Sequence, residues 1–176
     1  MKEIAPENSL GTYLTIKGIS NIEIFSKTGI PLSDLSKMRN GEIASIPAKR
    51  LYLISLVSGD SIGEVLRATY PNLKLAHSDN PPSNKIKSTT TPVGKVLFSL
   101  EEHTFEIISY KTGIRISRLR NLATKDSAII QSHQLYLVEQ AANREAGSLF
   151  TELFGDLKLN SKAEQDRLQK EEDNGD

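Results

Sequence analysis

The chain of 176 residues has no cysteine and no tryptophan, and its three histidines lie far apart. Without cysteine, neither a disulfide framework nor a thiolate metal site can form. His77, His103 and His133 are too scattered along the chain to indicate a metal cluster. We therefore expect no metal and no other cofactor.

Long apolar runs are also missing. No run approaches the roughly 20 apolar residues that a membrane helix requires. Residues 1–6 contain no apolar core followed by a cleavage site, so no secretion signal is expected. Apolar residues make up 38% of the chain and charged residues 25%, which is the balance of a soluble globular protein. We expect a cytoplasmic protein without a membrane partner.

The chain has no excess charge of either sign, because 22 basic side chains balance 22 acidic ones. Residues 1–73 carry 8 basic and 7 acidic side chains, and residues 92–157 carry 7 and 8. Phosphate contacts from Lys and Arg supply most of the affinity of proteins for DNA. A DNA-binding function therefore requires the positive charge to be concentrated on one face of each segment.

Catalytic patterns are absent as well. The adjacent carboxylates Glu101 and Glu102 are the nearest approach to a catalytic pair, but neighbouring residues on a helix point in different directions. No nucleophile, Gly-rich phosphate loop or metal set accompanies them. We do not expect an enzyme.

What the sequence does contain is an internal repeat. The tetrapeptide Lys-Thr-Gly-Ile at 27–30 recurs at 111–114, a shift of 84 residues, and the same shift pairs apolar positions without a gap. These pairs are Leu35 with Leu119, Met38 with Leu122, Ile46 with Ile130, Leu51-Tyr52-Leu53 with Leu135-Tyr136-Leu137, Leu66 with Phe150, Tyr70 with Phe154, and Leu73 with Leu157. Self-similarity at a fixed period indicates a tandem duplication.

The repeat sets the predicted domain boundaries. The first copy spans residues 8–73 and the second 92–157. Residues 74–91, rich in Pro, Ser, Thr and Asn without an apolar period, are predicted to be a flexible linker. Residues 158–176 are almost wholly polar, and we expect a mobile acidic tail with a frayed helix near 163–168.

The first copy is predicted to begin with two short helices. Leu10, Tyr13 and Leu14 have the i, i+3, i+4 spacing of one buried helix face, and Gly18 ends that helix. Residues 20–23 have the Ser-x-x-Glu form of a capping box, which starts the second helix. Gly29 ends it, because glycine adopts the positive φ of a tight turn at little cost.

Three more helices follow. Pro31 suits the first turn of a third helix, which ends at Asn40-Gly41. Pro47 opens a fourth, Gly59 ends it, and a fifth runs toward Pro71. The second copy repeats this plan with weaker helix start and stop signals. Ile107, Arg115 and Lys125 occupy the positions of Glu23, Pro31 and Gly41 in the first copy. Two all-helical units are predicted.

Residues 19–30, followed by Leu35-Ser36 and Asn40-Gly41, resemble the Cro/phage-repressor-type (XRE) helix-turn-helix family. Residues 51–55, 59–62 and 64–65 are similar to the fourth and fifth helices of that family. The resemblance covers residues 9–70 and, less well, 93–154. It implies an all-α fold of two tandem five-helix lambda-repressor-like helix-turn-helix domains joined by a Pro/Ser/Thr linker. In such a motif, the second helix shows one face to the core and the other to the DNA major groove.

The resemblance also implies site residues. Base-reading positions fall on Leu32, Ser33 and Lys37, and phosphate-positioning ones on Asn21, Arg39 and Asn40. In the second copy the aligned residues are Ile116, Ser117 and Asn121, with Phe105, Ala123 and Thr124. Nearby Arg115, Arg118, Arg120 and Lys125 are candidates for phosphate contacts that the aligned positions lack.

Two functions remain open at this point. One is a DNA-binding transcriptional regulator of a prokaryote or phage, whose two recognition helices read two half-sites of double-stranded DNA that do not form a perfect palindrome. The other is a protein-interaction module, such as an antitoxin, phage inhibitor or regulatory scaffold, that keeps the fold without DNA binding. Tyr70, Leu73, Phe154 and Leu157 are expected in the core or between the copies, and a homodimer through the fifth helix is a further alternative.

Overall fold

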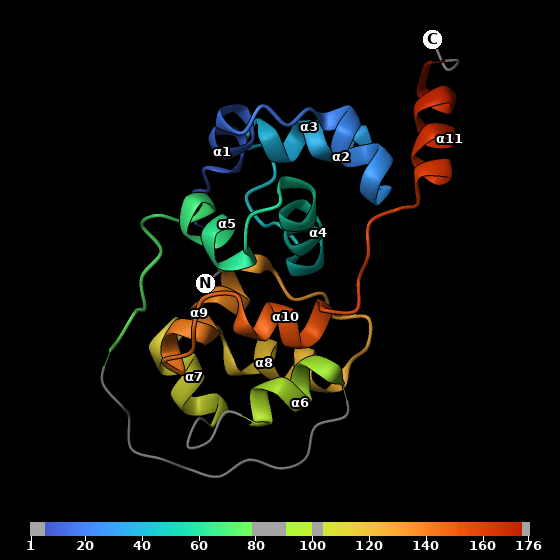
Figure 1. Ribbon diagram of the computed structural model, residues 1–176. Coiled ribbons are helices and arrows are strands. Elements are labelled where there is room, and N and C mark those ends of the chain that lie inside the picture. Colours follow the sequence, from blue (N-terminus) through green and yellow to red (C-terminus); the bar gives the residue numbers. More distant parts are fainter. Residues whose placement is uncertain (1–5, 79–90, 100–103, 174–176) are drawn as a thin grey trace.

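The computed structural model describes residues 6–78, 91–99 and 104–173, and its regular elements within these ranges are all helices (Figure 1). The first five are α1 (Leu10–Ile16), α2 (Asn21–Thr28), α3 (Leu32–Arg39), α4 (Ala48–Ser58) and α5 (Ile62–Thr69). The next five are α6 (Pro92–Ser99), α7 (Phe105–Thr112), α8 (Ile116–Thr124), α9 (Ser132–Ala141) and α10 (Ser148–Phe154), and α11 (Lys162–Asp173) follows. The all-α class is confirmed. We call α1–α5 the first set and α6–α10 the second set.

Local capping explains where several helices begin. The Ser20 hydroxyl accepts a hydrogen bond from the Glu23 N–H at 3.2 Å, as predicted for the start of α2. The Glu23 carboxylate, however, pairs with Lys27 at 2.6 Å, so α2 begins with only half of the expected capping box. A complete box forms instead at α5, between Ser61 and Glu64.

The second set starts its helices with fewer signals. Thr104 caps α7 by accepting the Ile107 N–H at 3.3 Å, so the position of Glu23 is filled by an apolar residue without loss of the cap. At α6, the Thr91 hydroxyl accepts the Gly94 N–H and donates to the Leu122 carbonyl of α8. One hydroxyl therefore both starts α6 and ties it to α8.

The two sets share one hydrophobic core. Leu51 of α4 and Phe150 of α10 are fully buried in the same cluster, and α4 packs against both α9 and α10. The Tyr70 hydroxyl, which is buried, lies 2.6 Å from the Ser132 hydroxyl of α9. Phe154 in turn lies against Tyr52, with ring centroids 6.0 Å apart. The expected packing of Tyr70 and Phe154 between the copies is confirmed.

A local twofold relationship connects the sets. Pro47 and Gln131, which are equivalent under the shift of 84, form an isolated antiparallel bridge. The Ala48 N–H donates to the Ile130 carbonyl at 2.9 Å, and the Ser132 N–H donates to the Ile46 carbonyl at 2.6 Å. These two bonds join equivalent positions in reciprocal fashion, as the contacts of a symmetric dimer do.

A second pair of equivalent residues allows α5 and α10 to approach closely. A Cβ at Gly63 would lie 2.4 Å from the Ala146 carbonyl oxygen, and one at Gly147 would lie 2.5 Å from Cγ2 of Ile62. Only glycine fits at such distances. The fifth helices thus contact each other within one chain, and the homodimer through this surface remains an untested alternative that would compete with this contact.

The segments that follow each set reach across to the other set. The Ala76 N–H donates to the Lys111 carbonyl at the end of α7, at 2.7 Å. The Asn160 N–H donates to the Lys27 carbonyl at the end of α2, also at 2.7 Å. Ala76 and Asn160 are equivalent under the shift of 84, as are Lys111 and Lys27. Each of the two segments, which we call arms, therefore makes the same contact with the opposite set.

These contacts involve the two segments that the sequence predicts to be a flexible linker and a mobile tail. Residues 74–78 are predicted to belong to the linker, and Ala76 in this segment contacts the end of α7. The rest of the predicted linker, residues 79–90, lies outside the described residues. The predicted mobile tail forms α11, which packs beside α2 (Figure 1). Here the Asn160 amide donates to the Ser26 carbonyl at 2.9 Å. The tail is ordered because it supplies donors to backbone carbonyls that the last turn of a helix leaves unpaired.

Candidate nucleic-acid interface

The repeated Lys-Thr-Gly-Ile tetrapeptide builds the turn between α2 and α3. The Thr28 hydroxyl donates to the Ile24 carbonyl at 2.6 Å and accepts the Ile30 N–H at 3.2 Å. Gly29 adopts φ +73°, in the left-handed region. Ile30 is buried behind the turn and anchors it to the core. The direction of α3 is thereby set by four consecutive residues.

The second copy of the tetrapeptide forms the same turn between α7 and α8. The Thr112 hydroxyl donates to the Ile108 carbonyl at 2.6 Å and accepts the Ile114 N–H at 3.1 Å. Gly113 has φ +75°, and Ile114 is buried. The two helix-Gly-helix turns therefore share their geometry as well as their sequence.

The outer face of α3 is open to solvent. Leu35 and Met38 are buried, as predicted, whereas Ser33, Lys37 and Asn40 are exposed. Leu32 is half-buried and packs against the core cluster. The base-reading positions implied by the resemblance are thus divided, with Ser33 and Lys37 accessible and Leu32 largely withdrawn.

Arg39 and Asn21, implied as phosphate contacts, are brought together and engaged within the protein. The Arg39 guanidinium donates to the Asn21 side-chain oxygen at 2.8 Å and to the Ile19 carbonyl at 2.5 Å. The Asn21 amide in turn donates to the Ser36 hydroxyl at 3.3 Å. Arg39 therefore ties the end of α3 to the start of α2, and its role in the structure is to hold the unit together.

The outer face of α8 carries more positive charge. Arg115, Ser117, Arg120, Asn121 and Lys125 are exposed, while Leu119 and Leu122 are buried beneath them. Among the described residues, no carboxylate forms an ion pair with Arg115, Arg120 or Lys125. Ile116 is half-buried, like its counterpart Leu32. We call the exposed Arg115, Arg120 and Lys125 the α8 basic cluster.

Arg118 differs from the basic cluster because it is engaged locally. Its guanidinium donates to the Ile129 carbonyl at 2.5 Å and to the Gln134 side chain of α9 at 3.2 Å. The equivalent contact in the first set is an ion pair between Asp34 and Arg50, at 2.8 Å. The third helix carries the acidic partner in the first set, Asp34, and a basic partner in the second set, Arg118. A side-chain contact between the third and fourth helices is present in both sets.

Two of the aligned second-copy positions are not accessible. Phe105, which occupies the place of Asn21, is 4% exposed, and Ala123, which occupies that of Arg39, is 1% exposed. Neither side chain reaches the surface, in keeping with the expectation that the aligned positions of the second copy lack phosphate contacts. Thr124 is exposed, but its hydroxyl donates to the Arg120 carbonyl at 2.7 Å.

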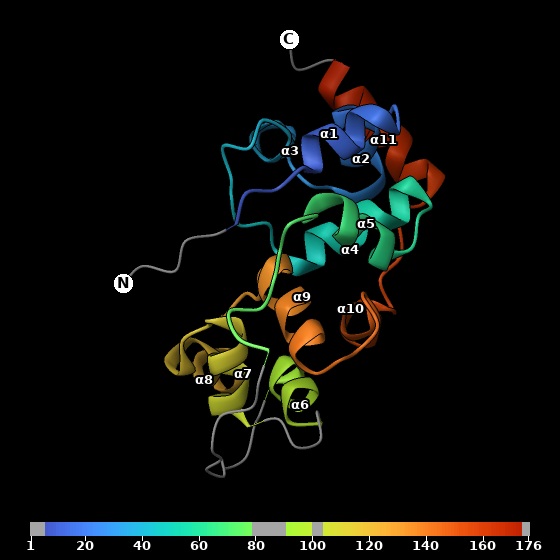
Figure 2. The same cartoon turned by 90° about the vertical axis from the view of Figure 1, so that its left-hand side faces the viewer.

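The two outer helices, α3 and α8, lie on the same side of the molecule (Figure 2). Figure 2 shows α3 and α8 on one side of the molecule, one above the other, with α6 and α10 on the other side of the second set. The reciprocal contacts at Pro47 and Gln131 join equivalent segments of the two sets between these helices.

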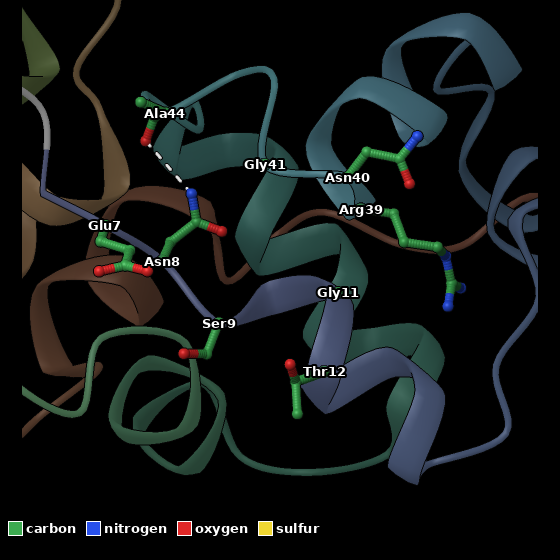
Figure 3. Close-up of a pocket in the computed structure, with 9 residues that line it drawn as sticks. All are labelled: Glu7, Asn8, Ser9, Gly11, Thr12, Arg39, Asn40, Gly41 and Ala44. Atoms are coloured by element: carbon green, nitrogen blue, oxygen red, sulfur yellow. Dashed lines mark hydrogen bonds between the residues drawn. The ribbon is translucent and has the colours of Figure 1, made fainter.

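A hollow of about 350 Å³ lies between the start of α1 and the end of α3 (Figure 3). Asn8 spans part of it by donating to the Ala44 carbonyl at 3.4 Å. Arg39 and Asn40 line the opposite wall. A Cβ at Gly11 would lie 2.0 Å from the Arg39 carbonyl oxygen, so α1 rests directly on the end of α3. The hollow marks a joint between helices.

Sequence reasoning did not find the residues that orient the outer helices. Arg50, Gln134 and Thr91 each contact the third helix of a set, yet no local pattern marks them. The swapped charges of Asp34 and Arg118 under the shift of 84 were an available signal, because a reversed charge at an equivalent position suggests a changed partner.

No protein-family model matches the chain, and neither the curated proteins nor the solved structures contain a significant match to it. None of the described helices is long and apolar enough to cross a membrane. The described residues also contain no group of three or more His, Cys, Asp or Glu side chains suited to a metal ion.

Proposed function

We propose that this chain is a DNA-binding transcriptional regulator in which two lambda-repressor-like helix-turn-helix units act together within one molecule. The observation that carries the proposal is the presentation of α3 and α8 on one side of the molecule (Figure 2). Each follows a helix-Gly-helix turn of the same geometry, at Gly29 and Gly113. In dimeric helix-turn-helix proteins, two recognition helices enter successive major grooves, about 34 Å apart.

The exposed charges indicate that the two units contribute unequally to phosphate contact. The α8 basic cluster provides three exposed cations without a carboxylate partner among the described residues, which suits phosphate contact. On α3, Lys37 is exposed while Arg39 is engaged within the protein. The second unit therefore supplies most of the affinity from charge, and both units supply outer faces for base contact.

The pairing of the units also changes the expected DNA site. The bridge at Pro47 and Gln131 holds the two units in one orientation, so the distance between half-sites is set by packing rather than by the connecting segment. We expect one preferred spacing. The half-sites are inverted relative to each other and differ in sequence.

Binding of the full chain to a pool of random duplexes, measured by fluorescence anisotropy at several salt concentrations, tests the proposal. Each phosphate contact contributes about 0.9 to the slope of log affinity against log salt. The variant R115A/R120A/K125A should lower that slope by roughly 2 to 3, with matched loss of affinity. The control K95A/K158A/K170A removes the same charge elsewhere and should leave the slope nearly unchanged. Affinity that does not fall with salt would contradict the proposal.

A protein-interaction module remains the second candidate, and one observation favours it. Ile129, next to α8 and α9, is 59% exposed, and Ile16 of α1 is 79% exposed. An exposed apolar patch marks a protein-protein contact site, whereas a single exposed aliphatic side chain is common on any protein surface. Stoichiometric capture of a defined protein partner that is lost in I129S, by a chain that does not bind DNA at low salt, would favour this function.

A further inference from the structure

The outer faces of α3 and α8 differ in a specific way. Lys37 and Asn121 are equivalent under the shift of 84, and both are exposed. Each lies two residues after a buried leucine, Leu35 or Leu119, so both side chains leave the helix on the solvent side. No described ion pair involves Lys37, and no described side-chain hydrogen bond involves Asn121.

Their surroundings share one exposed serine and differ elsewhere, since Ser36 corresponds to Arg120 and Pro31 to Arg115. Ser33 and Ser117, one helical turn earlier, are identical and exposed in both helices. Ser36, which precedes Lys37, accepts a hydrogen bond from Asn21 and is thereby occupied. Among the base-reading positions that the resemblance implies, Ser33 and Ser117 are the same and Leu32 and Ile116 are both half-buried. Lys37 and Asn121 are therefore the exposed pair that differs.

The two side chains recognise different bases. A lysine ammonium has donors and no acceptor, and it matches the N7 and O6 acceptors of guanine in the major groove. An asparagine amide has both a donor and an acceptor, and it matches the N7 acceptor and N6 donor of adenine. An exchange of Lys37 for Asn121 thus amounts to an exchange of guanine for adenine.

We propose that the DNA site is an inverted repeat whose halves differ at one equivalent base pair, with guanine opposite Lys37 and adenine opposite Asn121. This inference rests on the proposed DNA-binding function. The reciprocal contacts at Pro47 and Gln131 join equivalent segments of the two sets, as in a symmetric dimer, and such a pairing suits inverted half-sites. The asymmetry of the site then fixes which unit of the chain occupies which half.

Selection of binding sequences from a random duplex library, with the intact chain, tests this inference. The wild type should select one half-site with guanine and the other with adenine at the equivalent position. K37N should convert the guanine half to adenine and so make the site symmetric at that base pair. N121K should make it symmetric with guanine. Each exchange should alter the preference between the two bases by about 5- to 150-fold.

The outcomes separate the inference from the function on which it rests. Selected sites that are symmetric at this pair in the wild type, or base preferences that K37N and N121K leave unchanged, would overturn the inference while DNA binding stands. A library without enrichment, together with affinity that does not depend on salt, would refute the DNA-binding function and this inference with it. The control K95N, on α6, should leave the selected sequence unchanged.

Discussion

Pro47 and Gln131 occupy the same position in two copies of one sequence pattern, and they pair with each other across the middle of the molecule. Residues on either side form reciprocal backbone hydrogen bonds, from Ala48 to Ile130 and from Ser132 to Ile46. A repeat within one chain has thus formed the contact that two separate subunits make in a symmetric dimer.

The close approach at Gly63 predicts a large effect from one added methyl group. G63A places a Cβ 2.4 Å from the Ala146 carbonyl oxygen, and backbone on both sides must move. We expect the unfolding free energy to fall by about 1–3 kcal/mol, as in overpacked cores. Chemical denaturation monitored by circular dichroism measures this. R67A, at an exposed position of α5, is the control, and equal effects of the two changes would contradict the prediction.

Arg39 and Lys37 should separate stability from binding. R39A removes hydrogen bonds to the Asn21 side chain and to the Ile19 carbonyl, leaving partly buried acceptors unpaired, at a cost of about 1 kcal/mol. K37A removes an exposed side chain and should leave stability within about 0.5 kcal/mol. When DNA affinity is corrected for the fraction of folded protein, K37A should bind DNA more weakly than R39A. A K37A variant that unfolds as readily as R39A would contradict this assignment.

Arg118 and Arg120 lie two residues apart but should behave differently. Arg118 is engaged with Ile129 and Gln134, whereas Arg120 belongs to the α8 basic cluster. R120A should reduce the salt slope of DNA binding by about 1 with little change in melting temperature. R118A should lower the melting temperature with little change in slope. The reverse assignment, seen by anisotropy and thermal melts, would show that Arg118 is the phosphate contact.

Glu139 should make stability depend on pH. Its carboxylate is buried and accepts the Gly147 and Leu149 N–H groups at 2.8 Å. Burial raises the pKa of Glu139 to about 7, although backbone hydrogen bonds act in the opposite direction. Because the pKa is above its unfolded value, its contribution to stability is complete below about pH 4.5. It is lost as pH rises through 7.

The variant E139Q tests this dependence. Glutamine cannot ionise, so the loss of stability between pH 4.5 and 7 that Glu139 causes, roughly 1–3 kcal/mol, should disappear. Its amide also leaves one backbone donor unpaired, which costs about 1–3 kcal/mol across the pH range. Denaturation midpoints at several pH values measure both effects. A wild type and an E139Q variant with parallel pH profiles would contradict the raised pKa.

The arm that ends in α11 should stabilise the first set. Truncation after Leu157 removes the Asn160 hydrogen bonds to the Lys27 and Ser26 carbonyls. We expect a chain that still folds but melts at lower temperature, with increased hydrogen exchange at the end of α2. N160A should produce part of the effect, about 0.5–1.5 kcal/mol, because its backbone N–H is retained. Unchanged exchange at α2 after truncation would show that the arm contributes nothing.

The sequence by itself determined the helices, their repeat and the inner faces of α3 and α8. Leu35, Met38, Leu119 and Leu122 are buried as their spacing predicts, because the 3.6-residue period of a helix places them on one side. Turns such as that at Gly29 are equally local, since one backbone conformation and one threonine hydroxyl define them.

Only the tertiary structure decided which groups remain free for a partner. Arg39 and Arg118 have the chemistry of phosphate contacts, yet their hydrogen bonds go to residues 11 to 24 positions away in the chain. The segments that contain Ala76 and Asn160 likewise contact the opposite set, because the backbone N–H of each residue donates to a carbonyl at the end of a helix there. Spacing along a chain predicts the face of a helix, but the partner of a long side chain depends on where distant segments come to lie.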